Sequence, residues 1–192
     1  MRVITNALAL VGALALAAGL AAFIKARALL AELDPGAGKT WSAAARIFLE
    51  TGNPAEAAVW KAQVKEGLSF DDVDQAIGSL AASANIRDVG ALPLGDQVAA
   101  MDGKPWRKLK IYLYCNPLTA AHMIDYSEAF SAFLPCRVAL LEDGSGKLWI
   151  YTLNMDLLIH GGKPLPAPLR DEALRVKTVM RSLLSDGAKG AF

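Results

Sequence analysis

An uncharged apolar stretch at residues 3–24 is the feature that most constrains how this 192-residue chain can fold. Thr5 and Asn6 are the only clearly polar residues in it. As a helix rising about 1.5 Å per residue, the stretch is long enough to cross the hydrocarbon core of a bilayer. The helical pattern continues past Lys25 and Arg27. The sequence therefore predicts a transmembrane anchor and its extension at residues 1–33.

A cleaved signal peptide is the competing interpretation of this stretch, because Arg2 gives it a short basic start. The apolar run is unusually long for a signal peptide, however. Residues 25–28 (Lys-Ala-Arg-Ala) are also a poor context for cleavage. We therefore expect a retained, single-pass anchor, and the lipid bilayer is the first partner that the sequence predicts.

Three small residues, Gly12, Ala15 and Gly19, lie near one face of the predicted anchor helix. Their spacing would let a second transmembrane helix approach closely. An alanine-rich helix has small residues on every face, so the same spacing also arises without a partner. A membrane-protein partner at this face and a homo-oligomer are therefore hypotheses.

Charge near the anchor leaves its orientation ambiguous. Lys25, Arg27 and Lys39 follow the apolar stretch, whereas only Arg2 and the amino terminus precede it. Counting these short flanks places the following domain in the cytoplasm. Long domains after an anchor can nevertheless be exported despite modest flanking charge.

Overall charge and one failed motif exclude two classes of partner. The formal net charge is only +1, so electrostatics indicate no nucleic acid and no acidic partner. Residues 36–40 (Gly-Ala-Gly-Lys-Thr) look like a phosphate-binding loop, but the motif requires a glycine where Leu33 stands. No strand pattern precedes the loop either, so we reject nucleotide binding.

After the anchor, the residue patterns predict a linker, an α+β domain and a C-terminal extension. The linker covers residues 34–56 and contains a short amphipathic helix; the domain covers residues 57–160; the extension covers residues 161–192, with a Pro/Gly connector, a helix and a frayed tail. Strand patterns occur at residues 58–64, 86–92, 108–114, 137–141 and 148–153, and helical patterns lie between them. This order favours a sheet with helices packed on one face.

Both cysteines fall beside the clearest strand patterns. Residues 108–114 alternate between two faces, with the aliphatic residues on one of them. Asn116 is a good helix N-cap, and Pro117 suits the first helical position. Cys115 is therefore expected where a strand turns into a helix, and Cys136 where the next strand begins.

Three motifs in this region resemble the family called domain of unknown function 302. They are Leu113-Tyr-Cys115-Asn-Pro117, then Phe133-Leu-Pro-Cys136-Arg137, then Glu142-Asp143 with Gly146-Lys147-Leu148-Trp149. The resemblance covers roughly residues 59–154 and leaves the anchor and residues 161–192 outside the core family pattern. It implies a TATA-binding-protein-like α+β fold, with a curved antiparallel sheet and helices packed on it. It implies little about activity.

The resemblance also implies a cellular setting. Members with an anchor and two cysteines look like bacterial envelope proteins of sulfur- or methane-oxidising organisms. We therefore expect a bacterial inner-membrane protein whose domain is periplasmic, with a cytoplasmic domain as the alternative. The expected function is an accessory or binding subunit of a respiratory or sulfur- or methane-oxidation-linked redox system. We expect no catalysis of its own, because no set of catalytic side chains is legible.

The two cysteines leave several chemical interpretations open. Cys115 and Cys136 could form a structural disulfide or remain as buried thiols. They could instead hold a soft metal or a haem, together with His122 and Met155, with Met123 and His160 as further candidates. A catalytic redox pair is the weakest interpretation, because the chain has no Cys-x-x-Cys motif. Copper or haem is accordingly the only cofactor alternative.

Overall fold

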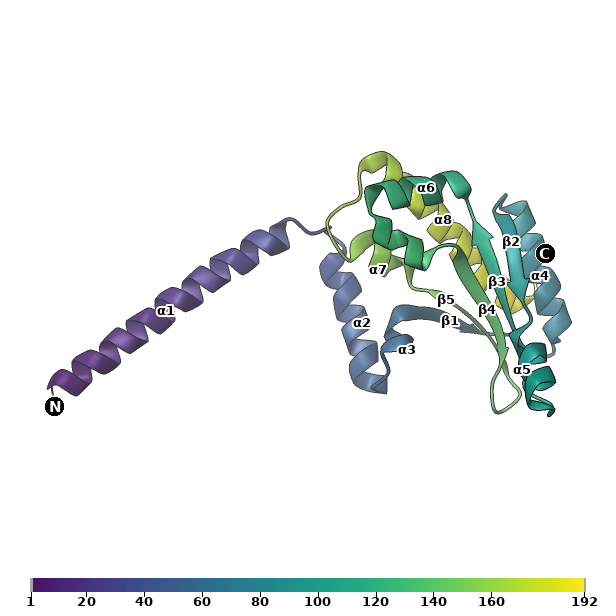
Figure 1. Ribbon diagram of the computed structural model, residues 1–192, viewed down its shortest axis with the longest axis horizontal. Coiled ribbons are helices and arrows are strands. Elements are labelled where there is room, and N and C mark those ends of the chain that lie inside the picture. Colours follow the sequence, from purple (N-terminus) through teal and green to yellow (C-terminus); the bar gives the residue numbers. More distant parts are fainter. Residues whose placement is uncertain (1, 192) are drawn as a thin grey trace.

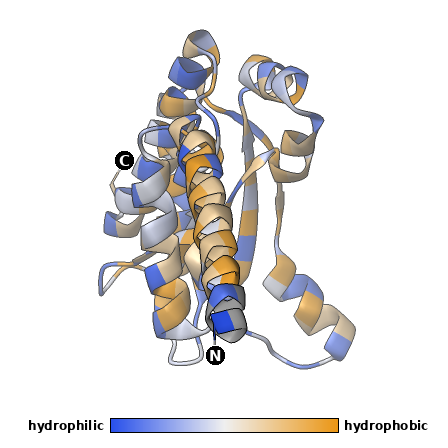
Figure 2. Cartoon of the chain, turned by 90° about the vertical axis from the view of Figure 1, so that its left-hand side faces the viewer, coloured by the Kyte–Doolittle hydropathy of each residue, from blue (hydrophilic) through white to orange (hydrophobic). Residues whose placement is uncertain are grey.

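The first helix, α1 (Arg2–Ala31), projects away from the rest of the chain in the computed structural model, which describes residues 2–191 (Figure 1). Within it, Ala9–Ala31 is long and apolar enough to cross a membrane, and none of that stretch is buried. Hydropathy colouring shows α1 as apolar over most of its length (Figure 2). The prediction of one apolar N-terminal helix is confirmed.

Two further helices, α2 (Ala37–Thr51) and α3 (Pro54–Ala58), join α1 to the sheet. The short amphipathic helix predicted within residues 34–56 is α2, which begins at Ala37. The helix α3 was not predicted. It begins because Asn53 Oδ1 accepts a hydrogen bond from the Ala55 amide at 3.0 Å, and Pro54 occupies the first helical position. The Gly-Asn-Pro break therefore ends one helix and starts another.

Five antiparallel strands form one sheet in the order β1-β5-β4-β3-β2. The strands are β1 (Val59–Gln63), β2 (Arg87–Leu92), β3 (Leu109–Cys115), β4 (Cys136–Glu142) and β5 (Leu148–Leu153). The turn between β4 and β5 is held by Asp143, whose Oδ1 accepts from the amides of Ser145 at 2.8 Å and Lys147 at 3.0 Å. The first strand of the chain thus pairs with the last.

The remaining helices pack around this sheet (Figure 1). They are α4 (Phe70–Ser83), α5 (Leu94–Asp102), α6 (Pro117–Tyr126), α7 (Met155–His160), α8 (Ala167–Ser185) and two 3₁₀ helices, η1 (Glu128–Phe133) and η2 (Gly187–Lys189). A capping box starts α4: the Asp72 amide donates to Ser69 Oγ, and the Ser69 amide donates to Asp72 Oδ2. The predicted α+β fold with a C-terminal helix is confirmed.

The core lies between the sheet and the helices α4 and α8. Its fully buried side chains include Val73, Ile77, Tyr114, Val138, Leu140, Ile150, Met180 and Leu183. In β3 the tyrosine face is buried, while the aliphatic face is only half-buried. Burial of Tyr112 is compatible with its polar end, because its hydroxyl donates to Asp74 Oδ1 at 2.9 Å.

The segment after α8 packs against the domain. Gly187 and Ala188 are buried in η2, and the amide of Lys65 donates to the carbonyl oxygen of Ala188 at 2.8 Å. The prediction of a frayed tail is therefore wrong for these residues, because a backbone hydrogen bond and core contacts hold them.

Candidate functional site

A narrow apolar cavity of about 50 Å³ lies at the end of the sheet where β3 ends and β4 begins. The turn after β3, the helix α6, η1 and the start of β4 form one side of it. The helices α7 and α8 form the other side. A cavity of this size holds an ion or a ligand of a few atoms, because about 10–15 Å³ of such space is enough for one water molecule.

Five sulfur-containing side chains line this cavity: Cys115, Met123, Cys136, Met155 and Met180. Cys115, Cys136 and Met155 are predicted ligands, and Met123 is one of the further candidates. Met180 was not among the predicted ligands. Helical periodicity indicates that a methionine is buried, but it does not show which cavity the side chain lines. We call these five residues the sulfur cluster.

Local sequence determines where the sulfur cluster lies. Asn116 Oδ1 accepts a hydrogen bond from the amide of Thr119 at 3.2 Å and caps α6, so the chain turns directly after Cys115. Asn154 caps α7 in the same way, at 3.1 Å from an amide of that helix. Met155 therefore becomes the first residue of α7 and is buried. Both asparagines occupy the N-cap position, where asparagine is a preferred residue.

Both cysteines are free thiols in the structure. Cys136 pairs with Tyr114 across β3 and β4, so Cys115 lies one position out of register with it. Burial raises the pKa of Cys115, and burial together with the neighbouring Cys115 raises the pKa of Cys136 to about 11. Redox-active cysteines have a lowered pKa, because the thiolate is the nucleophile. The raised pKa values of Cys115 and Cys136 are the opposite of what such a pair requires. The disulfide between them stays a prediction.

Polar groups at the cavity are few. Thr119 and Thr152 are buried, and Thr152 Oγ1 donates to the carbonyl oxygen of Arg137 at 2.8 Å. The side chain of Arg137 is exposed at the edge of the cavity. The site therefore combines an apolar interior, several soft sulfur atoms and one cationic side chain at its rim.

The predicted ligand His122 lies apart from the cavity lining. Its Nδ1 is 3.1 Å from Glu172 Oε2 of α8, and its side chain is exposed. Successive residues of a helix point about 100° apart, so Met123, its neighbour, takes the inward position instead. The structure therefore places His122 apart from the other predicted ligands, at the surface between α6 and α8.

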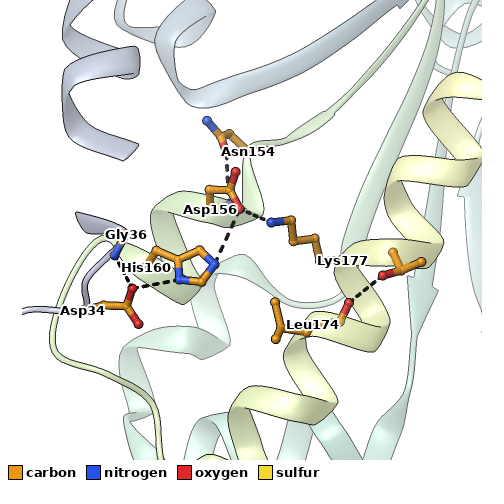
Figure 3. Close-up of polar contacts among 8 residues, drawn as sticks. Asp34, Gly36, Asn154, Asp156, His160, Leu174 and Lys177 are labelled. Carbon is orange, nitrogen blue, oxygen red and sulfur yellow. Dashed lines mark hydrogen bonds and ion pairs between the residues drawn. The ribbon is translucent and has the colours of Figure 1, made fainter. Parts of the chain in front are cut away.

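The candidate ligand His160 belongs to a second site, which is polar and lies at the start of the linker (Figure 3). Its Nδ1 is 3.0 Å from Asp34 Oδ1, and that oxygen also accepts from the amide of Gly36 at 2.7 Å. Its Nε2 is 4.0 Å from Asp156 Oδ1, which also contacts Lys177 Nζ. We call Asp34, Asp156, His160 and Lys177 the junction cluster.

The junction cluster fastens the end of α1 to the domain. Asp34 is only 3% exposed, and among residues 2–191 its Oδ2 has no hydrogen-bond partner. The hydrogen bond from Gly36, followed by that from His160, lowers the pKa of Asp34, so the side chain is ionised at neutral pH. Asp34 was not among the predicted site residues. The hydrogen bond from Gly36 to Asp34 is a local turn that the residues Asp-x-Gly indicate. The contact with His160 could not be predicted, because that residue is far away in the sequence.

No group of three or more His, Cys, Asp or Glu residues that could hold a metal ion occurs within the described part of the chain. A metal in the cavity would therefore depend on methionine sulfur in addition to the two thiols. Soft sulfur donors suit copper(I), zinc and iron–sulfur clusters. Zinc and iron–sulfur sites use cysteine, histidine or carboxylate ligands and not methionine, so this donor set favours copper(I). The cavity is also smaller than the pockets of about 300–1,000 Å³ that hold drug-sized molecules, so its size favours an ion over a haem.

Comparison with known proteins gives a family and a fold. The family model described as Domain of unknown function DUF302 matches residues 60–186. The crystal structure of an uncharacterized conserved protein DUF302 from Bacillus stearothermophilus superimposes with a TM-score of 0.54 at 14% sequence identity, over 68% of this chain and 98% of that chain. At this identity the likeness shows the fold alone. No curated protein sequence matches the chain.

The family match is longer than the resemblance found in the sequence. It includes α8, which we had placed outside the core family pattern. That placement is wrong, because α8 contributes Met180, Leu183 and Leu184 to the core. The helix α1 and the whole of the predicted linker lie before the matched residues.

Proposed function

The chain belongs to the family described as Domain of unknown function DUF302, and from that premise we propose a membrane-anchored accessory or binding subunit of a bacterial envelope redox system. We propose no catalysis of its own. The exposed apolar helix α1 carries the proposal, because no part of Ala9–Ala31 is buried against the domain. A large exposed apolar surface is typical of segments that contact a membrane or a partner protein. The proposed location is the inner membrane, with the domain on the periplasmic side.

A second transmembrane helix is the proposed partner at the face formed by Gly12, Ala15 and Gly19. All three residues are exposed on α1, and a Cβ atom added at Gly12 or Gly19 would meet nothing within 4 Å. Small residues at this spacing allow two helix backbones to approach closely. The partner is either a helix of a larger membrane complex or the α1 helix of a second copy.

Alkaline carbonate extraction of native membranes tests the anchor. We expect the intact chain to stay in the membrane pellet, because only a spanning segment resists this treatment. Recovery in the soluble fraction, with the apolar stretch removed, would overturn the proposal. A photo-reactive residue at Ala15 tests the partner face, with the exposed Leu10 on the opposite side of the helix as the matched control. Crosslinks from Ala15 alone are expected, and equal crosslinking from both positions would contradict a defined partner face.

Copper(I) binding is a second candidate function, favoured by the five sulfur-containing side chains around one cavity. The two thiols and the thioether of Met155 would supply soft ligands of the kind that copper(I) prefers. Because both thiols have a raised pKa, binding would release protons and would weaken as the pH falls. This activity is compatible with a binding subunit and needs no catalytic residue.

Competition with a chromophoric copper(I) chelator under anaerobic conditions tests this candidate. We expect about one copper per chain in the wild type, with binding lost in Cys136→Ser and weakened at least tenfold in Met155→Leu. Met101→Leu is the matched control, because Met101 is exposed and lies outside the cavity lining. Copper uptake that is unchanged in Cys136→Ser would exclude the cavity as the site.

A further inference from the structure

The helix α2 exposes a row of large apolar side chains. Trp41, Phe48 and Leu49 are 53%, 46% and 81% exposed, respectively. At about 100° per residue, these three side chains and Ala45 fall within an arc of about 100° around the helix. An arc of this width is what a helix normally buries against a core or a membrane.

The other two sides of α2 are already accounted for. Ala37, Thr40 and Ala44 are buried against the domain. Exposed polar residues form the remaining side: Lys39, Ser42, Arg46 and Glu50. The apolar arc lies between these two sides and continues into an open apolar groove, which is also lined by Pro54 and Ala57 of α3 and by Leu157 of α7.

The junction fixes where this surface lies relative to α1. The amide of Asp34 donates to the carbonyl oxygen of Gly162 at 2.8 Å, and Trp41 Nε1 donates to that of Gly161 at 2.7 Å. Lys163 Nζ lies 2.6 Å from Glu32 Oε2. These contacts, together with the junction cluster, hold both ends of the short connection between α1 and α2. In Figure 1 α2 turns away from the direction of α1 and does not continue it.

From these observations we propose that α2 is an interfacial helix, whose apolar arc lies in the headgroup region of the bilayer that α1 crosses. The inference rests on the membrane attachment proposed above. Tryptophan is enriched at membrane–water interfaces, and amphipathic helices lie there with their apolar side in the headgroup and acyl boundary. The exposed basic residues Lys25, Arg27, Lys39 and Arg46 flank this region and match anionic lipid headgroups.

Quenching by brominated lipids tests the proposal on the full chain in vesicles of phosphatidylcholine and phosphatidylglycerol. The variant L49W places a tryptophan on the apolar arc. The variant E50W places one on the neighbouring polar side and is the matched control. We expect brominated phosphatidylcholine to quench the added fluorescence of L49W at least threefold more than that of E50W. We also expect Trp41→Phe to remove part of the quenching seen in the wild type, whereas Trp106→Phe leaves it unchanged.

Two results would overturn the inference. Equal quenching of L49W and E50W would show that the apolar arc has no preferred contact with lipid. A blue-shifted but unquenched L49W would show that protein, not lipid, covers it. Both results count only for protein that remains in the vesicles after carbonate extraction, so they are distinct from failure of the anchor itself. Urea unfolding midpoints equal to that of the wild type establish that the variants are folded.

Discussion

The two cysteines of the sulfur cluster differ in how their sulfur atoms are shielded. Both pKa values are raised by burial, and that of Cys136 reaches about 11. Cys136 belongs to the β4 ladder, whereas Cys115 lies at the end of β3, where the chain turns. The reactivity of each cysteine therefore depends on how accessible its sulfur atom is to a reagent and on the fraction of the thiol that is ionised.

Alkylation should discriminate between the two thiols. We expect iodoacetamide to modify Cys115 faster than Cys136 near neutral pH, because the thiolate is the reacting species. The rate at Cys136 should rise as the pH approaches about 11. Mass spectrometry of the two modified peptides measures both rates, and the urea-unfolded chain, in which the rates should converge, is the control. Equal rates in the folded protein would contradict the difference in burial.

Asp34 should make stability depend on acid pH. Its pKa in the folded state is lowered, first by the Gly36 amide and then by His160. The contribution of ionised Asp34 to the free energy of unfolding is therefore fully present above its pKa in the unfolded state, about 4. It is lost as the pH falls through its pKa in the folded state. We expect Asp34→Asn to cost about 1.5–3 kcal/mol of the free energy of unfolding at neutral pH, with a smaller difference in acid.

Urea unfolding of the wild type and Asp34→Asn at both pH values provides this measurement. Asp96→Asn is a suitable control, because Asp96 is an exposed residue on α5 and should leave the difference between the two pH values unchanged. A difference for Asp34→Asn that is as large in acid as at neutral pH would mean that charge at this position does not stabilise the junction.

Among the elements, those with a clear start signal were predicted best. Asn116 marks the beginning of α6, and its side chain accepts the capping hydrogen bond that its position predicts. The strand patterns at residues 137–141 and 148–153 likewise become the paired strands β4 and β5. These features depend on neighbouring residues only, so a single sequence contains the information that they need.

Features that depend on distant residues could not be predicted. The pairing of β1 with β5 joins Val59 to Leu153, and no local pattern marks that partnership. The position of Met180 in the cavity lining and the contact of Asp34 with His160 also depend on residues far apart in the sequence. The sequence could therefore nominate Cys115, Cys136 and Met155, but it could not separate them from His122.

The capping box of α4 should be measurable in stability. We expect Ser69→Ala to lower the free energy of unfolding by about 1 kcal/mol, because an amide at the helix start loses its acceptor. Ser83→Ala, near the other end of α4, should change the free energy of unfolding by less than about 0.5 kcal/mol. Ser83 Oγ only donates an additional hydrogen bond to the carbonyl oxygen of Ser79 within the same helix. Urea unfolding followed by circular dichroism compares them, and equal effects would argue against the cap.

Two glycines form a matched pair for packing between elements. A Cβ atom at Gly95 would lie 2.7 Å from both the carbonyl oxygen of Arg107 and the amide nitrogen of Leu109, so α5 could not stay against β3. We expect Gly95→Ala to destabilise the domain by about 1–3 kcal/mol. Gly78 of α4 has open space instead. Gly78→Ala should stabilise by up to about 1 kcal/mol, and destabilisation at Gly78 would contradict the geometry.

For the molecule as a whole, the anchor and the domain should be independent in unfolding. The helix α1 is exposed along Ala9–Ala31, so its residues add nothing to the core. We expect Gly12→Leu and Gly19→Leu to leave the free energy of unfolding of the detergent-solubilised protein unchanged within about 0.5 kcal/mol. Leu183→Ala, in the core, should cost about 2–5 kcal/mol.

Tryptophan fluorescence reports this transition, because all four tryptophans lie after α1. A shift of the midpoint in Gly12→Leu or Gly19→Leu comparable with that of Leu183→Ala would mean that α1 contributes to the folded core. An unchanged midpoint in Leu183→Ala would mean that fluorescence does not follow the packing of α8.

The pairing of the first strand with the last determines the order of events during biogenesis. β1 cannot find its neighbour until Leu148–Leu153 has been synthesised. Translation at about 5–20 residues per second makes this a delay of several seconds after β1 is made. All of α1 is complete well before then. If α1 enters the bilayer as proposed, the nascent chain would therefore reach the membrane while its sheet is still open, and targeting would precede folding.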